Sequence, residues 1–443
     1  MTIFALLTAL LPLALQSLIP ASSHQRQQDA VCLQIQEDIS PASTVYFPGD
    51  DRYTAGIMHW ASSSSENSIC VVEPGSSEDV AAVRTSFAVK GGGHASNVGF
   101  SSTTGVQIAM SRISDVKYDA HSQTAEIGAG LKWDDVYAAL EAHNVSVVGG
   151  RVSGVGVAGF TLGEGGFNNF GIVTKFTLKT FPSKGVWGGF QYVAGTDLAQ
   201  NAAAVADFCA NVTDPKANII SNYGKGYMIY LHLCLLACDD TNSFLRRPKS
   251  PPPGIFDNLL AVPTLFSDVS SRNMTSFVKL VPDSIGLRGA FHTVPILKFT
   301  PSLLDVIANE SAFWGTKLAP KGAGLITYAI EPFQPDIYEH NPDKTAYPPV
   351  RDVGYLPLNL YFAWVSAEFD EDFHAAMIAS GEVIRQAAIA EGQDITNGPL
   401  YPNYAFPETP LSEIYGENVA ELRRIKQIVD PKDIMGLAGG SKF

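Results

Sequence analysis

The stretch KGGGHASNVGF, residues 90–100, places three consecutive glycines directly before a single histidine, His94. It follows the apolar run SFAVK, residues 86–90, which we expect to form a strand, so the glycines begin where that strand ends. Because glycine has no side chain, such a loop lets a ligand approach several backbone N–H groups closely. The stretch therefore predicts a ligand-binding loop with an imidazole at its end.

Further glycine clusters follow at residues 128–130, 149–150 and 154–159. The last, GVGVAG, has the G-x-G-x-x-G spacing of a Rossmann dinucleotide site, which needs a strand before the glycines and a helix that opens on them. We do not expect the following FTLGEGGFNNFG to form that helix, so the sequence argues against a Rossmann site. The clusters are interpreted as loops around a bulky cofactor that carries phosphate. The alternative is a set of tight turns in a β-rich domain.

The totals limit the class of protein. The 443 residues carry a formal net charge of −14 and a sequence pI near 5.1, which argues against nucleic acid or an anionic membrane as a partner. The nine histidines show no spacing typical of a metal site, and no G-x-S-x-G nucleophile motif occurs.

The first residues have the layout of a secretory signal peptide. An apolar run at residues 3–18 is followed by Pro20 and small residues, with cleavage expected near Ser23. The alternative is an uncleaved membrane anchor. In a secretory compartment, Cys32 and Cys70 are the best candidates for a disulfide among the five cysteines. Glycans are then possible at four sequons, Asn144, Asn211, Asn273 and Asn309.

Two apolar segments have a clear expected structure. Residues 132–144 have helical periodicity and are expected to form a helix. The apolar segment 227–238 is too short to span a bilayer and is expected to be a core strand or helix. The apolar face of the first segment holds Trp133, Val136, Tyr137 and Leu140.

Four motifs in this order carry a family resemblance: FAVKGGGHASNVGFSS, GAGLKWDDVYAAL, VVGGRVSGVGVAGF and NNFGIVTKFTL. With the C-terminal YPNYAFPETPLSEIYGENVAELRRIKQIVDPKDIMG, they closely resemble the FAD-linked oxidoreductases of the berberine bridge enzyme group, within the vanillyl-alcohol oxidase (PCMH-type) flavoprotein superfamily. The resemblance implies an α+β fold, in which a two-part PCMH-type FAD-binding domain is joined to an α+β substrate domain with an antiparallel sheet.

The resemblance also implies the division of the chain. The expected parts are a signal peptide at 1–23, an N-terminal segment at 24–65, a shortened FAD-binding domain at 66–184, a substrate domain at 185–395, and a C-terminal segment at 396–443 that completes the FAD site.

In this family the histidine of the glycine loop is bonded covalently to the flavin, and His94 occupies that position. Some members have a second covalent bond from a cysteine, but this chain has Val152 there, so a single bond is implied. Tyr401 and Tyr404 are the candidate catalytic bases, which requires that their pKa be lowered. The resemblance implies the following cofactor-binding residues: Lys90, Gly91, Gly92, Gly93, His94, Ala95, Asn97, Gly150, Ser153, Gly156, Gly159, Ile172, Val173, Tyr401 and Asn403.

The chain departs from the family after Gly166. The family has several dozen further residues there, including strands beside the adenine half of FAD, whereas here Phe167 follows directly. This indicates an internal deletion.

The expected function is that of an FAD-dependent oxidase. It would transfer hydride from a small alcohol, amine or ring carbon of a secondary metabolite to flavin, with O₂ as the acceptor, in a secreted monomer. The alternatives are a carbohydrate oxidase of the same fold, and a non-catalytic secreted glycoprotein that lost FAD binding through the deletion.

Overall fold

The computed structural model describes residues 23–226, 230–239, 250–280, 286–334, 336–339 and 343–443. Helices and antiparallel sheets are mixed along the chain, which confirms the predicted α+β class. The predicted signal peptide lies almost entirely outside these ranges. None of the described helices combines the length and apolar character needed to cross a bilayer.

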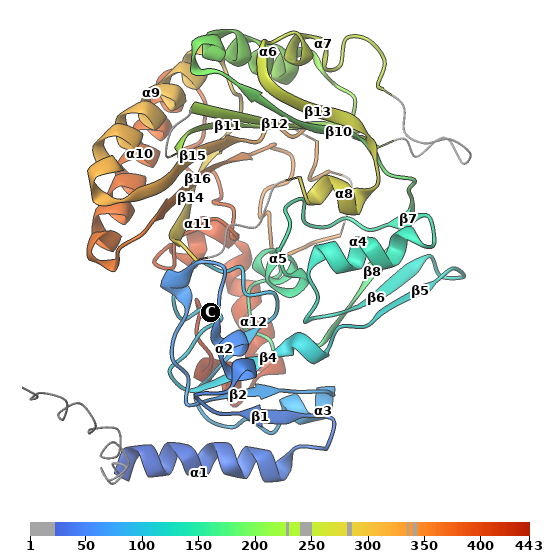
Figure 1. Cartoon of the computed structure of the whole chain (residues 1–443), viewed down its shortest axis with the longest axis vertical. Helices are drawn as coiled ribbons and strands as arrows, with labels where there is room; N and C mark the ends of the chain where they lie inside the picture. The colour runs from blue at the N-terminus through green and yellow to red at the C-terminus, as the bar shows by residue number, and fades with distance from the viewer. Residues whose placement is uncertain (1–22, 227–229, 240–249, 281–285, 335, 340–342) are drawn as a thin grey trace, which may run out of the picture.

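The first sheet carries the strand that leads into the glycine loop (Figure 1). Its order is β1-β2-β4-β3; β1 is antiparallel to β2, while β2 and β3 are both parallel to β4. A disulfide between Cys32 and Cys70 joins the N-terminal helix to β2, as predicted. The strands are β1 (Thr44–Tyr46), β2 (Cys70–Glu73), β3 (Phe87–Lys90) and β4 (Val106–Ala109), and the helices are α1 (Ser23–Asp38), α2 (Asp51–Ile57) and α3 (Ser77–Val80).

A second, antiparallel sheet of order β5-β6-β8 adjoins the first. Helix α4 buries the four residues expected on its apolar face, so that prediction is confirmed. The elements are β5 (Val116–Asp119), β6 (Thr124–Gly128), α4 (Trp133–Glu141), β7 (Val145–Ser146), α5 (Val157–Glu164), β8 (Lys175–Lys179) and β9 (Phe181–Pro182), with β7 paired to β9.

The expectation that no helix follows the GVGVAG cluster is wrong, because α5 runs from Val157 to Glu164. Its glycines have low helix propensity, but tertiary contacts override that preference. Val157 and Ala158 are buried, and the Tyr415 hydroxyl donates a 2.5 Å hydrogen bond to the carbonyl of Gly163. A Rossmann site is still not formed, since the strand before the cluster, β7, has two residues and an antiparallel partner.

A seven-stranded antiparallel sheet forms the other half of the molecule (Figure 1). Its order is β13-β10-β12-β11-β15-β16-β14. Of the segment 227–238, expected to be a strand or helix, residues 227–229 lie outside the described residues and the rest belongs to strand β12. The strands are β10 (Val186–Val193), β11 (Ala217–Gly226), β12 (Tyr230–Asp239), β13 (Thr264–Arg272), β14 (Arg288–Ile296), β15 (Ala323–Ile330) and β16 (Leu356–Trp364).

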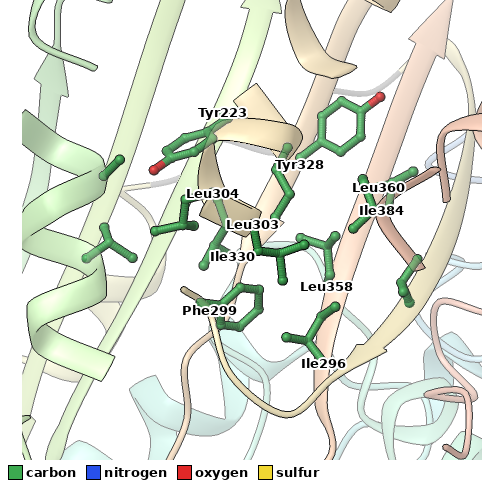
Figure 2. Close-up of a cluster of buried hydrophobic side chains, with 14 of the residues drawn as sticks. Tyr223, Ile296, Phe299, Leu303, Leu304, Tyr328, Ile330, Leu358, Leu360 and Ile384 are labelled. Carbon is green, nitrogen blue, oxygen red and sulfur yellow. The ribbon is translucent and has the colours of Figure 1, made fainter. Parts of the chain in front are cut away.

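Helices cover one face of this sheet, and the core lies between them (Figure 2). Leu303 and Leu304 from α9 pack there with Ile330 and Leu358 of the sheet, all fully buried. The helices of this half are α6 (Leu198–Asn211), α7 (Asp257–Leu260), α8 (Met274–Val278), α9 (Pro301–Leu318) and α10 (Asp370–Ala390).

The C-terminal segment returns to lie between the two halves (Figure 1). It contains α11 (Leu411–Tyr415) and α12 (Asn418–Val429). Beyond α12, Ala438 forms a parallel bridge with Phe87, the first residue of β3. Asn169 then donates from Nδ2 to the carbonyl of Ser441, 3.0 Å away. The last residues thus pack on the same strand that leads into the glycine loop.

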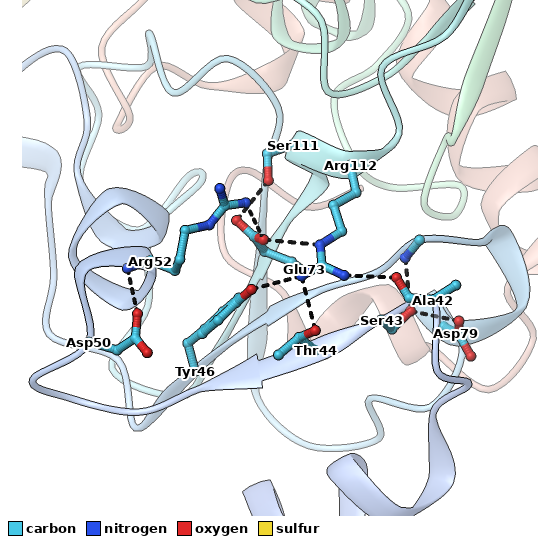
Figure 3. Close-up of polar contacts among 11 residues, drawn as sticks. Ala42, Ser43, Thr44, Tyr46, Asp50, Arg52, Glu73, Asp79, Ser111 and Arg112 are labelled. Atoms are coloured by element: carbon cyan, nitrogen blue, oxygen red, sulfur yellow. Dashed lines mark hydrogen bonds and ion pairs between the residues drawn. The ribbon is translucent and has the colours of Figure 1, made fainter.

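Two buried carboxylates hold the first sheet together (Figure 3). Glu73, 2% exposed, pairs with Arg52 at 2.5 Å and Arg112 at 3.2 Å. Asp79 accepts hydrogen bonds from Ser43 Oγ at 2.6 Å, from the backbone N and Oγ of Ser40, and from Ser76 Oγ. These bonds, the one from Ser43 first, hold the pKa of Asp79 well below its usual range.

We predict that Asp79→Asn lowers the free energy of unfolding by about 1–3 kcal/mol at pH 7, because hydrogen bonds to a charged acceptor are lost. A carboxyl whose pKa is lower in the folded than in the unfolded chain stabilises the fold above about pH 4, and this contribution is lost as the pH falls further. The difference between wild type and variant, measured by urea unfolding, should therefore shrink below about pH 4. The exposed neighbour supplies the control, Glu78→Gln, and an equal loss in both variants would contradict the role of Asp79.

Candidate flavin site

The two glycine loops meet backbone to backbone. A Cβ added to Gly156 would lie 2.5 Å from the backbone nitrogen of Gly92, and a Cβ added to Gly92 would collide with Gly156 in turn. Gly91 is similarly restricted, since its Cβ would lie 2.9 Å from the carbonyl oxygen of Ala129. The loops predicted to hold the diphosphate are therefore adjacent, and glycine is required at their contact.

The first loop presents unused backbone donors. Among the described residues, none accepts a hydrogen bond from the N–H groups of Gly92, Gly93, His94 or Ala95. Gly93 has φ +74°, the left-handed conformation that turns successive N–H groups toward a common point. Several unpaired N–H donors in one short loop suit the oxygens of a diphosphate, so the residues present fit this part of FAD.

His94 lies in a cluster of aromatic rings. Its imidazole stacks on Trp60 with ring centroids 4.4 Å apart and an interplanar angle of 14°. The rings of Phe291 in β14 and Tyr361 in β16 also pack on this indole, with ring centroids 5.5 and 5.2 Å from that of Trp60. Burial lowers the pKa of His94 to about 4, so the imidazole is neutral at pH 7. We call Trp60, His94, Phe291 and Tyr361 the aromatic cluster.

Three of the expected cofactor-binding residues fix the first loop to its surroundings. Lys90 donates from Nζ to the carbonyls of Ala55 and Met58, both at 2.8 Å, and burial lowers its pKa to about 8. Ala95 accepts at its carbonyl a 2.7 Å hydrogen bond from Ser64, and Asn97 donates from Nδ2 to the carbonyl of Ala405. The side chains of Lys90 and Asn97 and the carbonyl of Ala95 therefore hold the first loop in place by hydrogen bonds within the protein.

The second loop is partly closed by its own contacts. Ser153 Oγ donates to Asp134 Oδ1 at 2.7 Å, and Gly150 packs against the indole of Trp133. Gly159 is exposed on α5, with no atom within 4 Å of an added Cβ.

Ile172 packs against the core of the first sheet and Val173 is half-buried. Among the expected residues of the second half of the FAD-binding part, Gly156 contacts Gly92 of the first loop.

The C-terminal segment contributes two tyrosine–carboxyl pairs. Tyr401 donates to Glu164 Oε1 and Tyr404 donates to Glu331 Oε1, both at 3.0 Å. Asn403 donates from Nδ2 to the Tyr401 hydroxyl at 3.0 Å. The two tyrosine rings are 4.9 Å apart, and Phe291 lies 5.8 Å from Tyr404. The tyrosines expected near the flavin therefore adjoin the aromatic cluster that contains His94.

Arg151 supplies the positive charge that pairs with the Glu331 carboxylate. Its Nη2 lies 2.6 Å from Glu331 Oε1 and donates to the Tyr404 hydroxyl at 3.2 Å. Burial raises the pKa of Glu331, while Arg151 acts in the opposite direction. Burial, and next the Glu331 carboxylate, raise the pKa of Tyr404 above its usual value.

The pKa of Tyr401 is raised in the same way. It lies well above 10, first because the side chain is buried and next because the Glu164 carboxylate lies beside it. The lowered pKa that a tyrosine base requires is therefore absent from this arrangement. Both hydroxyls act here as donors to carboxyl groups, and Glu331, rather than Tyr404, is the group able to accept a proton.

Only some of these groups have a recognisable signal in the sequence. Glu331 directly follows the apolar strand β15, and an isolated carboxylate at such a strand end is recognisable as a candidate. Trp60 and Phe291, in contrast, have the sequence pattern of ordinary core residues. Their position beside His94 depends on a contact between distant parts of the chain.

Comparison with known proteins identifies the family. Residues 68–172 match the family described as FAD binding domain. The chain is 32% identical, over 462 aligned positions, to the FAD-dependent monooxygenase tpcD of Cochliobolus heterostrophus, and the alignment covers 87% of each chain. Because the alignment is longer than the 443 residues of this chain, the relative has residues without a counterpart here.

Solved structures show the same fold at lower identity. BBE-like 1 of Physcomitrella patens superposes with a TM-score of 0.71 at 16% identity, covering 91% of this chain and 97% of that one. The carbohydrate oxidase of Microdochium nivale gives 0.68 at 16% identity, covering 90% and 98%. Both confirm the predicted PCMH-type architecture. The FAD-binding domain and the 32%-identical relative show that the chain belongs to the FAD-linked oxidoreductases, and the solved structures show that it has the fold of berberine bridge enzyme-like proteins.

Proposed function

We propose that the protein is an FAD-dependent oxidase acting on a small alcohol, amine or ring carbon of a secondary metabolite, with O₂ as the acceptor. The observation that carries this proposal is the juxtaposition of unpaired N–H groups, the neutral His94 and the Tyr404–Glu331 pair. Bound flavin would accept the hydride, while side chains of the protein position the flavin and accept the proton that the substrate releases. We further propose a secreted monomer.

The proposal assigns the single covalent attachment of flavin to His94. A neutral imidazole has a free lone pair on one ring nitrogen, which bond formation requires, and the lowered pKa of His94 supports that state. Val152 offers no second attachment, since its side chain is apolar.

Proton transfer is assigned to the Tyr404–Glu331 pair. A proton released by the substrate hydroxyl or amine would be accepted by Glu331, either directly or along the hydrogen bond from Tyr404. Arg151 opposes the effect of burial on Glu331 and so favours its charged form. Tyr401, paired with Glu164, is proposed to orient the C-terminal segment beside the cofactor.

One alternative is supported by a specific observation. The alignment with the fungal relative leaves residues of that relative without a counterpart in this chain, consistent with the deletion expected after Gly166. A chain that lacks strands beside the adenine would bind FAD weakly, which favours a non-catalytic glycoprotein as the second candidate.

The first test is the colour of the denatured protein. We predict that wild-type protein precipitated with acid keeps its yellow flavin, and that His94→Ala releases all of it, because the only proposed covalent bond is lost. Flavin absorbance in pellet and supernatant measures both. His121→Ala, a change of an exposed histidine, is the control and should keep the colour. A colourless wild type would support the non-catalytic candidate.

The second test concerns the contact between the loops. Gly92→Ala places a Cβ against Gly156, and its backbone cannot yield without separating the loops. We predict loss of flavin from the purified variant, with at least about a tenfold lower affinity of the apoprotein for added FAD. Fluorescence quenching of free FAD measures this affinity. The control is Gly165→Ala, at an exposed position where an added Cβ meets no atom closer than 3.6 Å, and it should bind FAD like wild type.

The third test addresses the proton acceptor. Glu331→Gln removes the group that accepts the proton, so we predict that flavin reduction slows by about 10²-fold or more with any alcohol found active in a peroxide screen. Stopped-flow absorbance at the flavin band follows the reduction. The control, Glu339→Gln, changes an exposed carboxylate of the same region. Equal rates in the two variants would remove Glu331 from the mechanism.

A further inference from the structure

A groove of about 420 Å³ is lined by the end of α4, by β7 and the residues after β9, and by the start of α8, on the border between the two halves. Its lining is polar and includes Glu141, Ser146, Ser183 and Lys184. The volume is within the range of small-ligand sites, and no role in the proposed flavin chemistry involves it. Two of the four sequons, Asn144 and Asn273, lie on this groove.

Asn273 is held by its own hydrogen bonds. Its Oδ1 accepts from the backbone N of Ser276 at 2.8 Å, and its Nδ2 donates to Glu141 Oε2 at 2.9 Å. The hydroxyl of Thr275, the third residue of that sequon, donates to Glu141 Oε1 at 2.7 Å. Attachment of a sugar to Asn273 would use Nδ2, the atom that already donates a hydrogen bond to Glu141.

Asn144 differs from Asn273, because its side-chain amide is not held by hydrogen bonds in the part of the chain that the structure describes. It is exposed, and within the described residues its side-chain amide has no hydrogen-bond partner. Its backbone is fixed, because its N–H donates to the carbonyl of Glu141 and its carbonyl accepts from the N–H of Ser183. With φ +55°, the residue holds a free amide at the edge of the groove.

The two remaining sequons have no such groove. Asn211 donates from Nδ2 to Asp207 Oδ1 at 2.7 Å at the end of α6. Asn309 is exposed on α9, whose inner face packs in the core of the seven-stranded half. Neither lines the groove.

We propose that Asn144 carries an N-linked glycan and that the groove holds its first N-acetylglucosamine units. The proposal rests on the predicted secretory route and is independent of the flavin chemistry. In the transfer, Asn144 Nδ2 bonds to C1 of the sugar and loses a proton, while the lipid diphosphate of the oligosaccharide donor leaves. The sugar hydroxyls would face Ser183 and Lys184, and the apolar sugar face would lie against Val145 and Met274.

The glycan would then bridge the two halves of the molecule. Val145 belongs to β7 of the first half, whereas Met274 begins α8 of the second. A sugar in contact with both resists their separation, so loss of the glycan is expected to lower the midpoint of thermal unfolding.

The test is expression of the full chain behind a yeast secretion leader, followed by glycopeptide mass spectrometry. Asn144→Gln and Ser146→Ala should both lose the glycan, and Ser146→Ala keeps the asparagine in its left-handed turn. Ser146→Thr, which keeps the sequon, should retain it. Asn309→Gln serves as the control for a sequon outside the groove.

The position of the sugars is tested by endoglycosidase trimming. We expect trimming at Asn144 to be at least about tenfold slower in the native protein than after heat denaturation and reduction, because sugars in the groove are shielded. An unmodified Asn144 overturns the proposal, whatever the other sequons carry. Equal trimming rates before and after denaturation also overturn it, because they place the sugars in solvent.

Discussion

The backbone contact between Gly92 and Gly156 is the constraint on which the rest of the site depends. It joins the end of β3 to the start of α5 with no side chain between them, and so fixes where α5 begins. Because an α-helix rises 1.5 Å per residue, the eight residues of α5 then determine how far Glu164 lies from the first glycine loop. Glu164 receives the Tyr401 hydroxyl, so the C-terminal segment is positioned by the same contact.

Two chemically unequal tyrosine–carboxyl pairs result from this arrangement. Glu331 is paired with a cation, Arg151, whereas Glu164 has the Tyr401 hydroxyl as its hydrogen-bond donor. Burial raises the pKa of both carboxyls, but at Glu331 a guanidinium opposes this effect. At Glu164 the hydrogen bond from Tyr401 opposes burial, so the two carboxyls differ in that a positive charge lies beside Glu331.

Much of this fold could be predicted from local patterns. The apolar face of α4, the strand before the glycine loop and the Cys32–Cys70 disulfide depend on periodicity, turn residues and the redox compartment. Helix α5 could not be predicted, because its glycines oppose a helix and the residues that stabilise it, such as Tyr415, come from the far end of the chain.

The site follows the same division. His94 is identified by the motif around it, because the glycines that precede it are local. The aromatic rings that surround it come from a segment before β2 and from strands of the other half, so no single stretch of sequence contains the pattern. The raised pKa of Tyr404 was likewise inaccessible, since it depends on burial and on Glu331.

The placement of the C-terminal segment has a consequence for biosynthesis. The glycine loop is made early, but Asn97 finds its acceptor at Ala405, and Phe87 finds its bridge partner at Ala438. During translation Asn97 and Phe87 therefore lack these partners until more than three hundred later residues have been synthesised. The site can therefore be completed only after the C-terminal segment has been synthesised.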